Sequence, residues 1–170
     1  MKLLVHIALL ITFLPAISYA QDHSEHNEHE TKMAEGVEAL SHDLRYLLSE
    51  EMKALEKGMM SIIPAIVSGK WHEIETTAGK MKASYILKQK LTKNQMKELH
   101  SKLPNAFIEK DQRFHYLSGM LEHAANKQKP ELINFYFSEM TKSCMGCHSK
   151  FATHKFPDLS SNKKKDDHSH

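Results

Sequence analysis

The sequence predicts an all-α fold, an antiparallel four-helix bundle. Apolar residues recur three and four positions apart along four long stretches, which places them on one face of an α-helix in each case. No stretch shows the alternation of apolar and polar residues that a half-buried strand requires, and the 170 residues include only six glycines. Amphipathic helices joined by short links bury their apolar faces by packing against antiparallel neighbours.

The first helix is expected over residues 34–67, with one continuous apolar stripe. Pro64 should remove a backbone hydrogen bond and bend the last turns, and Gly69 should close the helix because glycine accepts a left-handed backbone. The stripe comprises Val37, Leu40, Leu44, Leu48, Met52, Leu55, Met59, Ile63 and Ile66.

The second helix is expected over residues 71–91, followed by a short helix. The segment Thr92-Lys93-Asn94-Gln95 has the form of a capping box and should begin the short helix, which ends before Pro104. The apolar seam of the second helix comprises Trp71, Ile74, Ala78, Met81 and Tyr85.

The third helix is expected over residues 106–125, and the fourth begins at Pro130, which suits a first helical turn, and runs to Phe156. The apolar face of the fourth helix comprises Ile133, Phe137, Met140, Cys144, His148 and Phe151.

The N-terminus has the pattern of a secretory signal. A positive Lys2 precedes an apolar run, and Ser18-Tyr19-Ala20 gives the small-x-small cleavage pattern. The run is short for a membrane span and contains Pro15, so we expect cleavage, a periplasmic protein and no membrane segment in the mature chain. The expected organisation is a signal peptide over 1–20, a His- and Glu-rich tail over 21–33, the bundle over 34–156 and a charged tail over 157–170.

Charge and the two tails bear on possible partners. The net charge of +2 is too small to indicate a nucleic acid, although a local basic surface can still bind an acidic redox partner. The tails suggest weak metal binding or, with more weight, a solvated segment, because no scaffold fixes their imidazoles. Their histidines are His23, His26, His29, His168 and His170.

The segment Cys144-Met145-Gly146-Cys147-His148 carries the chemistry. C-x-x-C-H is the attachment signature of a c-type haem: two thiols form thioethers with one porphyrin, and the histidine binds its iron. A thioredoxin-like pair would need a βαβ context, and a zinc site would need further ligands beyond the only two cysteines. The sequence therefore predicts one covalent haem c with iron bound by His148.

The position of this motif on the last helix resembles the cytochrome c′ family, the class II c-type cytochromes. The resemblance covers about residues 34–155. Further matching features are Met52-Lys53-Ala54-Leu55, Gly58-Met59, Pro64 and Gly69 in and after the first helix, Asp111, Phe114 and Ala124-Ala125 in the third, and the stretch Cys144 to Phe151 in the fourth.

The resemblance implies the distal side of the haem. It places Met52 there, and family members with a methionine at this position resemble dedicated electron carriers whose iron is low-spin. Where an apolar residue replaces it, the iron is five-coordinate and binds nitric oxide or carbon monoxide. We therefore expect a non-enzymatic electron carrier with His148 and Met52 as ligands, transient periplasmic redox partners and, as in many family members, a homodimer as one option beside the monomer. The alternative is a gas-binding protein.

Two departures from the family weaken the gas-binding expectation. A basic residue often follows the aromatic residue after the proximal histidine, but Ala152 stands there, with Lys150 or Lys155 as replacements. An arginine common near the distal position would fall on Leu48, one turn after Arg45.

Other residues compete for roles around the haem. Met52 can be ordinary core, and Met59 and Met60 are rival ligands. Among the histidines, His115 is the most plausible alternative iron ligand, ahead of His42 and His123, although each is expected at the surface or rim. Phe114, Phe137 and Phe151 are expected near the porphyrin. Metal handling by the tails and a haem peroxidase are weaker functional alternatives, since no distal acid–base group stands out.

Overall fold

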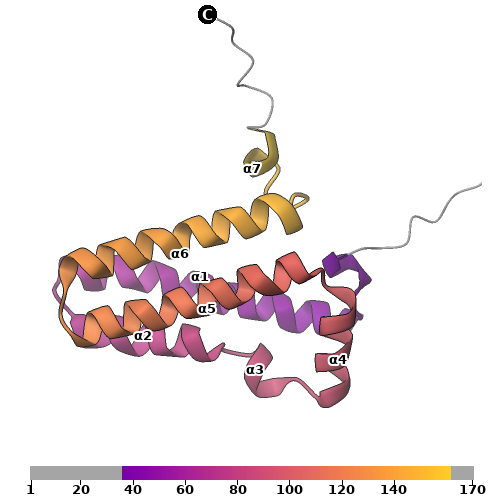
Figure 1. The fold of residues 1–170 in the computed structure, drawn as a ribbon, viewed down its shortest axis with the longest axis horizontal. Helices are drawn as coiled ribbons and strands as arrows, with labels where there is room; N and C mark the ends of the chain where they lie inside the picture. Colours follow the sequence, from indigo (N-terminus) through magenta and orange to yellow (C-terminus); the bar gives the residue numbers. More distant parts are fainter. Residues whose placement is uncertain (1–35, 162–170) are drawn as a thin grey trace, which may run out of the picture. The chain divides into compact units, whose positions relative to one another are not determined.

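The computed structural model describes residues 36–161, and within this range the chain is all-helical, without a strand (Figure 1). This confirms the all-α part of the predicted fold. The predicted signal peptide, the predicted N-terminal tail and the C-terminal histidines lie outside the described residues. No helix between residues 36 and 161 is both long and apolar enough to cross a membrane. The elements are η1 (Gly36–Ala39), α1 (His42–Val67), α2 (Trp71–Ala83), α3 (Leu87–Lys90), α4 (Lys93–Lys102), α5 (Asn105–Asn126), α6 (Pro130–Phe151) and α7 (Asp158–Ser161).

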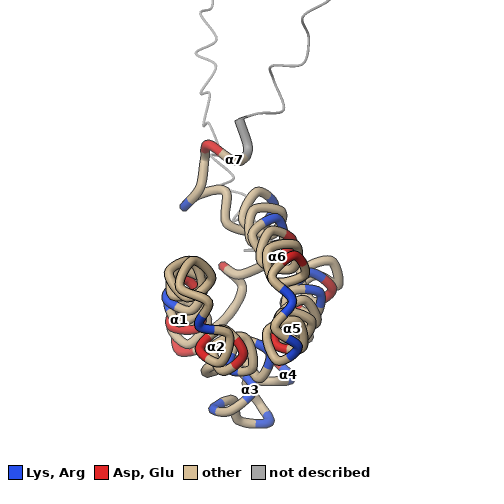
Figure 2. Tube along the Cα trace, turned by 90° about the vertical axis from the view of Figure 1, so that its left-hand side faces the viewer, with Lys and Arg blue, Asp and Glu red and all other residues tan. Residues whose placement is uncertain are grey.

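The four longest helices are α1, α2, α5 and α6, and they pack in chain order. Helix α1 packs against α2, α2 against α5 and α5 against α6, as the end-on view shows (Figure 2). Within the described residues, α1 and α6 share no interface of comparable extent. The first and last long helices are therefore held relative to each other mainly through α2 and α5.

The first helix begins later than the sequence predicts. A short 3₁₀ turn, η1, precedes it, and Ser41 has an extended backbone (φ −56°, ψ 156°). The Ser41 N–H donates to Glu98 Oε1 on α4 at 2.5 Å. Because this N–H is bonded to α4, the helix starts at His42 and not near residue 34. Its end at Val67 is as predicted, and Gly69 adopts φ +65°.

The prediction of a single helix over residues 71–91 is wrong. Helix α2 ends at Ala83, Ser84 takes a left-handed φ of +61°, and the short α3 follows. The backbone N–H groups of residues 85–87 donate to the carboxylate of Glu51 on α1. This long-range contact replaces the helical hydrogen bonds that would have continued α2.

The remaining helices follow the predictions more closely. The capping box is confirmed: Thr92 Oγ1 accepts from the Gln95 N–H at 3.3 Å, and Gln95 Oε1 accepts from the Thr92 N–H at 3.0 Å. Helix α5 matches the expected range within one residue at each end. Helix α6, however, ends at Phe151, five residues early.

The chain turns after α6 because Ala152 leaves the helical region with φ −136°. This turn returns Phe156 to the side of His148. The segment expected as a charged tail then starts with the helical turn α7, consistent with Pro157 beside its first residue.

The hydrophobic core falls into two clusters. The main cluster lies among α1, α2, α5 and α6, and its buried residues are Ile62, Ala65, Ile74, Ala78, Met81, Phe114, Leu117, Leu121, Ala124, Ala125, Ile133 and Met140. The N-terminal cluster joins the start of α1 to α4 and the first turn of α5, and its buried residues are Leu40, Leu44, Leu48, Leu99, Leu103 and Phe107. Residues of both clusters lie on α1 and on the C-terminal part of α6.

Candidate haem site

The C-x-x-C-H motif forms the last turns of α6. Cys144 and His148 are one helical turn apart and share a face of this helix. Both cysteines are free thiols and half-buried. Cys144 packs against the main cluster and Cys147 against the N-terminal cluster. The motif therefore bridges the junction of the two clusters.

The environment of the thiols distinguishes this pair from a redox-active dithiol. Burial raises the pKa of Cys144, and burial raises the pKa of Cys147 to about 11, although the positive charge of Lys110 acts in the opposite direction. Catalytic C-x-x-C pairs need a lowered thiol pKa, so that a thiolate attacks at neutral pH. The local electrostatics thus oppose the thioredoxin-like alternative. No group of three or more His, Cys, Asp or Glu side chains suited to a metal ion occurs in the described range.

His148 is half-buried, and its ring is held by an aromatic neighbour. The Phe156 ring stacks on the imidazole with centroids 4.3 Å apart and an interplanar angle of 4°. Burial lowers the pKa of His148, and the positive charge of Lys155 lowers it further. A neutral imidazole is the form that binds iron.

The two lysines proposed to replace the basic residue at Ala152 behave differently. Lys155 acts electrostatically on His148, whereas the Lys150 ammonium lies over the Phe151 ring at 5.4 Å from its centroid. Arg45 is directed elsewhere, because its guanidinium donates to the Glu38 carbonyl at 2.9 Å. Leu48 is buried in the N-terminal cluster.

Met52 lies at the edge of the α1 stripe and is 36% exposed, so its expected position on the inward face is wrong. Steps of three and four residues drift around a helix, and beyond Leu48 the buried face passes through other residues. Those residues are Glu51, Gly58, Ile62 and Ala65.

The neighbours of Met52 on α1 nevertheless belong to the same two clusters that the cysteines of the motif contact. Leu48, one turn earlier, is in the cluster that Cys147 contacts, and Leu55, three residues later, packs against the cluster that Cys144 contacts. Of the rival methionines, Met59 packs against the main cluster and Met60 is 68% exposed.

His115 is buried, not at the rim as the sequence suggested. Its Nδ1 lies 2.8 Å from the Met81 carbonyl oxygen at the end of α2, and its Nε2 lies 3.4 Å from Asp111 Oδ1. Both ring nitrogens thus have protein partners. His42 and His123 are exposed.

The surroundings of His115 predict a pH dependence of stability. Burial lowers its pKa, but the hydrogen bond and charge of Asp111, with the Met81 carbonyl, outweigh burial and the repulsion from Lys88 and leave the pKa raised above 6.5. A raised pKa means that protonation stabilises the folded state, fully below pH 6.5 and progressively less as the pH rises through the folded value. In urea unfolding between pH 6 and 9, the stability difference between wild type and His115→Gln should therefore shrink as pH rises. A difference that stays constant or grows would contradict this.

Glu51 is the residue that sequence reasoning missed, since it looked like part of a solvated outer face. It is 2% exposed, and its carboxylate accepts hydrogen bonds from Ser84 Oγ at 2.9 Å and from the N–H groups of residues 85, 86 and 87 at 3.0, 2.5 and 3.2 Å. One sequence signal pointed to it: Glu51 lies seven residues from both Leu44 and Gly58, on the buried side of α1.

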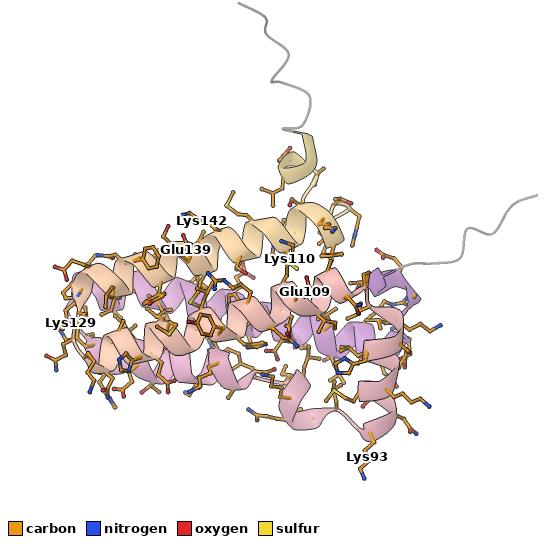
Figure 3. All side chains as sticks on the ribbon, in the orientation of Figure 1. Lys93, Glu109, Lys110, Lys129, Glu139 and Lys142 are labelled. Atoms are coloured by element: carbon orange, nitrogen blue, oxygen red, sulfur yellow. The ribbon has the colours of Figure 1, made fainter. Side chains whose placement is uncertain are left out.

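Helix α5 contributes two residues of opposite charge, Lys110 and Asp111, that act on the motif. Lys110 extends from α5 toward α6, and its Nζ lies 3.4 Å from the place that a Cβ on Gly146 would occupy (Figure 3). Lys110 and Asp111 act with opposite sign on the pKa of Cys147. The three phenylalanines expected near the porphyrin divide between the clusters: Phe114 and Phe137 belong with the main cluster and Phe151 with the N-terminal cluster.

Comparisons with known proteins do not assign this chain to a family. No protein-family model, no curated protein and no solved structure matches this chain.

Proposed function

We propose that this chain is an exported, periplasmic c-type cytochrome that carries single electrons through one covalently bound haem. In this proposal α1, α2, α5 and α6 form the antiparallel four-helix bundle of a cytochrome c′-like protein. The observation that carries the proposal is the C-x-x-C-H motif on α6, whose two thiols pack on separate apolar clusters at their junction. His148 is the proposed proximal ligand and Met52 the distal one.

The residues present fit a haem c. Cys144 and Cys147 are unpaired thiols at the spacing that thioether attachment requires, and His148 follows on the same helical face. Apolar side chains from both clusters surround the cysteines, as a porphyrin needs. The lack of an extensive α1–α6 interface is also consistent with a group held between Met52 and His148.

When bound, the haem supplies a one-electron iron couple, and the protein supplies the surroundings that adjust it. Phe156 stacks on the His148 ring and orients it, and burial, with the charge of Lys155, lowers the pKa of His148 and favours its neutral form. The Met52 thioether is a soft ligand that favours the ferrous state and raises the reduction potential. Apolar clusters on both sides exclude water. No substrate is transformed, so the proposed protein is not an enzyme.

The second candidate is a five-coordinate, gas-binding protein of the same fold. One observation favours it: Met52 is 36% exposed and belongs to neither apolar cluster. A thioether that packing does not hold can be displaced by carbon monoxide or nitric oxide.

The visible absorption spectrum of the holoprotein, oxidised and reduced, with and without carbon monoxide, tests the proposal. Electron transfer through a Met-ligated haem predicts a low-spin spectrum in both states, a Met-to-iron charge-transfer band when oxidised, and slow or absent carbon monoxide binding. A high-spin spectrum with ready carbon monoxide binding would instead support the second candidate.

The surface of α3 and α4 suggests the chemistry of the redox partner. It carries five exposed lysines that, within residues 36–161, have no carboxylate within 4.0 Å: Lys88, Lys90, Lys93, Lys97 and Lys102. Four other lysines of the described chain are paired with glutamates. The inner side of this segment includes Leu99, which shares the N-terminal cluster with Cys147. We propose that an acidic redox protein docks here transiently.

Replacing Lys88, Lys93 and Lys97 with glutamate should therefore slow electron transfer with ferricyanide, an anionic probe, and reverse the sign of its dependence on ionic strength. The matched control replaces Lys53, Lys70 and Lys142 with glutamate, because each of these lysines is paired with a glutamate. Equal effects of both triple variants in stopped-flow kinetics would show that net charge alone acts.

A homodimer also stays a prediction. The exposed side of α1 is less polar than its charged residues suggested, since Met60, Ile63 and Val67 are also exposed.

A further inference from the structure

We infer that Glu51 positions Met52: its buried carboxylate fixes the rotation of α1 so that the thioether faces the haem. This inference rests on the proposed function and adds a residue that does not itself touch the iron. Glu51 directly precedes Met52 in the middle of α1, away from both ends of this helix of 26 residues.

The hydrogen bonds of Glu51 are unusually complete for a carboxylate on a helix face. Oε1 accepts from Ser84 Oγ and the Tyr85 N–H, and Oε2 accepts from the N–H groups of Ile86 and Leu87. Hydrogen bonds to a charged, buried acceptor are stronger than neutral ones, and losing them leaves buried donors unsatisfied. Glu51 therefore ties one angular position of α1 to the α2–α3 connection.

Fixing Glu51 also fixes the direction of its neighbour. Successive side chains of an α-helix point about 100° apart, because 3.6 residues complete one turn. With Glu51 directed at the α2–α3 connection, Met52 must point away from it. Apolar packing does not provide this constraint, since Met52 belongs to neither cluster.

A second contact links the same end of α2 to the helix beside the motif. The Met81 carbonyl, three residues before Ser84, pairs with His115 on α5, and His115 pairs with Asp111. Asp111 in turn acts electrostatically on Cys147. The end of α2 thus connects α1, which carries Met52, to α5, which packs on the motif helix.

The close approach of α1 and α2 near Glu51 leaves little room for α1 to turn. A Cβ on Gly58 would lie 2.8 Å from the Tyr85 hydroxyl and 3.1 Å from Met81 Sδ. This contact and the Glu51 hydrogen bonds involve the same end of α2. Together they set both the distance and the rotation of α1.

The test is Glu51→Gln in the holoprotein. Glutamine keeps the shape, but its NH₂ group replaces one acceptor oxygen, so two of the four hydrogen bonds are lost. We expect a weaker Met-to-iron charge-transfer band, partial high-spin character and carbon monoxide binding that is faster by at least about tenfold. The matched control is Glu50→Gln, whose carboxylate bonds only the exposed Lys53 and whose spectrum should stay unchanged.

A second variant covers the case in which Glu51→Gln does not yield folded holoprotein. Ser84→Gly removes the hydroxyl donor, while glycine accepts the left-handed φ of +61°. It should move the band and the carbon monoxide rate in the same direction, by less. If the folded variant loses urea stability but keeps the wild-type band and carbon monoxide rate, Glu51 only holds the α2–α3 connection and the inference is overturned.

Failure of the proposed function gives a different result. If wild-type holoprotein lacks the charge-transfer band, or if Met52→Ala leaves it intact, Met52 is not the ligand and both proposals on the distal side fall. If wild type has the band and loses it in Met52→Ala but not in the Glu51 or Ser84 variants, only the inference about Glu51 falls.

Discussion

If Met52 is the distal ligand as proposed, Met52→Ala should convert a low-spin holoprotein into a high-spin protein that binds carbon monoxide readily. Alanine cannot reach the iron, so the sixth position opens and the Met-to-iron charge-transfer band disappears. The reduction potential should also fall, because the thioether favours the ferrous state. Absorption spectra of both oxidation states, stopped-flow carbon monoxide binding and a redox titration measure these changes.

Met60→Ala is the control for this variant. Met60 lies on the same helix and is 68% exposed, so its replacement removes a methionine without changing the distal side. Met59→Ala tests the remaining rival, which packs against the main cluster. If Met52→Ala keeps the band and Met59→Ala loses it, the distal ligand is Met59, two turns further along α1.

Replacing both cysteines of the motif with alanine should abolish covalent haem attachment. Each thiol forms one thioether, so Cys144→Ala or Cys147→Ala alone should leave a haem held by one bond, and the double variant none. Intact-mass measurement of the purified, exported chain shows the mass of one haem in wild type and its absence in the double variant.

The control for attachment lies within the motif. Met145 is one of the two residues between the cysteines, supplies no thiol and is 50% exposed, so Met145→Ala should keep the haem mass. A wild-type chain without this mass, purified from a host competent for c-type maturation, would contradict the proposed cofactor itself.

Local periodicity was sufficient to predict that the four long helices exist, but not where each of them ends, because an amphipathic helix depends on residues three and four positions apart. It failed at Ser84, where the chain leaves α2 in response to a carboxylate 33 residues earlier in the sequence. It failed again at Phe151, since the turn at Ala152 accompanies the stacking of Phe156 on His148. Neither break has a local signal such as proline or glycine.

The candidate site was predictable where its chemistry is contiguous. Five consecutive positions define the attachment motif, and the structure adds the contact of each thiol with its own cluster. The role of Met52 depended on a resemblance and stays a prediction. The burial of Glu51 and His115 was not predicted, because polar residues on amphipathic helices are usually solvated and the backbone groups that bind these two lie outside their own helices.

The two-cluster core also governs how the chain opens. Local unfolding proceeds in cooperative units that follow buried clusters, and the smaller N-terminal cluster should open more often than the main one. A haem bonded through Cys144 and Cys147 would belong to both units and make them open together. Amide hydrogen exchange should then show two distinct rates for α4 and α2 in the cysteine-free variant, and converging rates in the holoprotein. The cofactor would thus couple the local unfolding of the two clusters, in addition to serving as the redox centre.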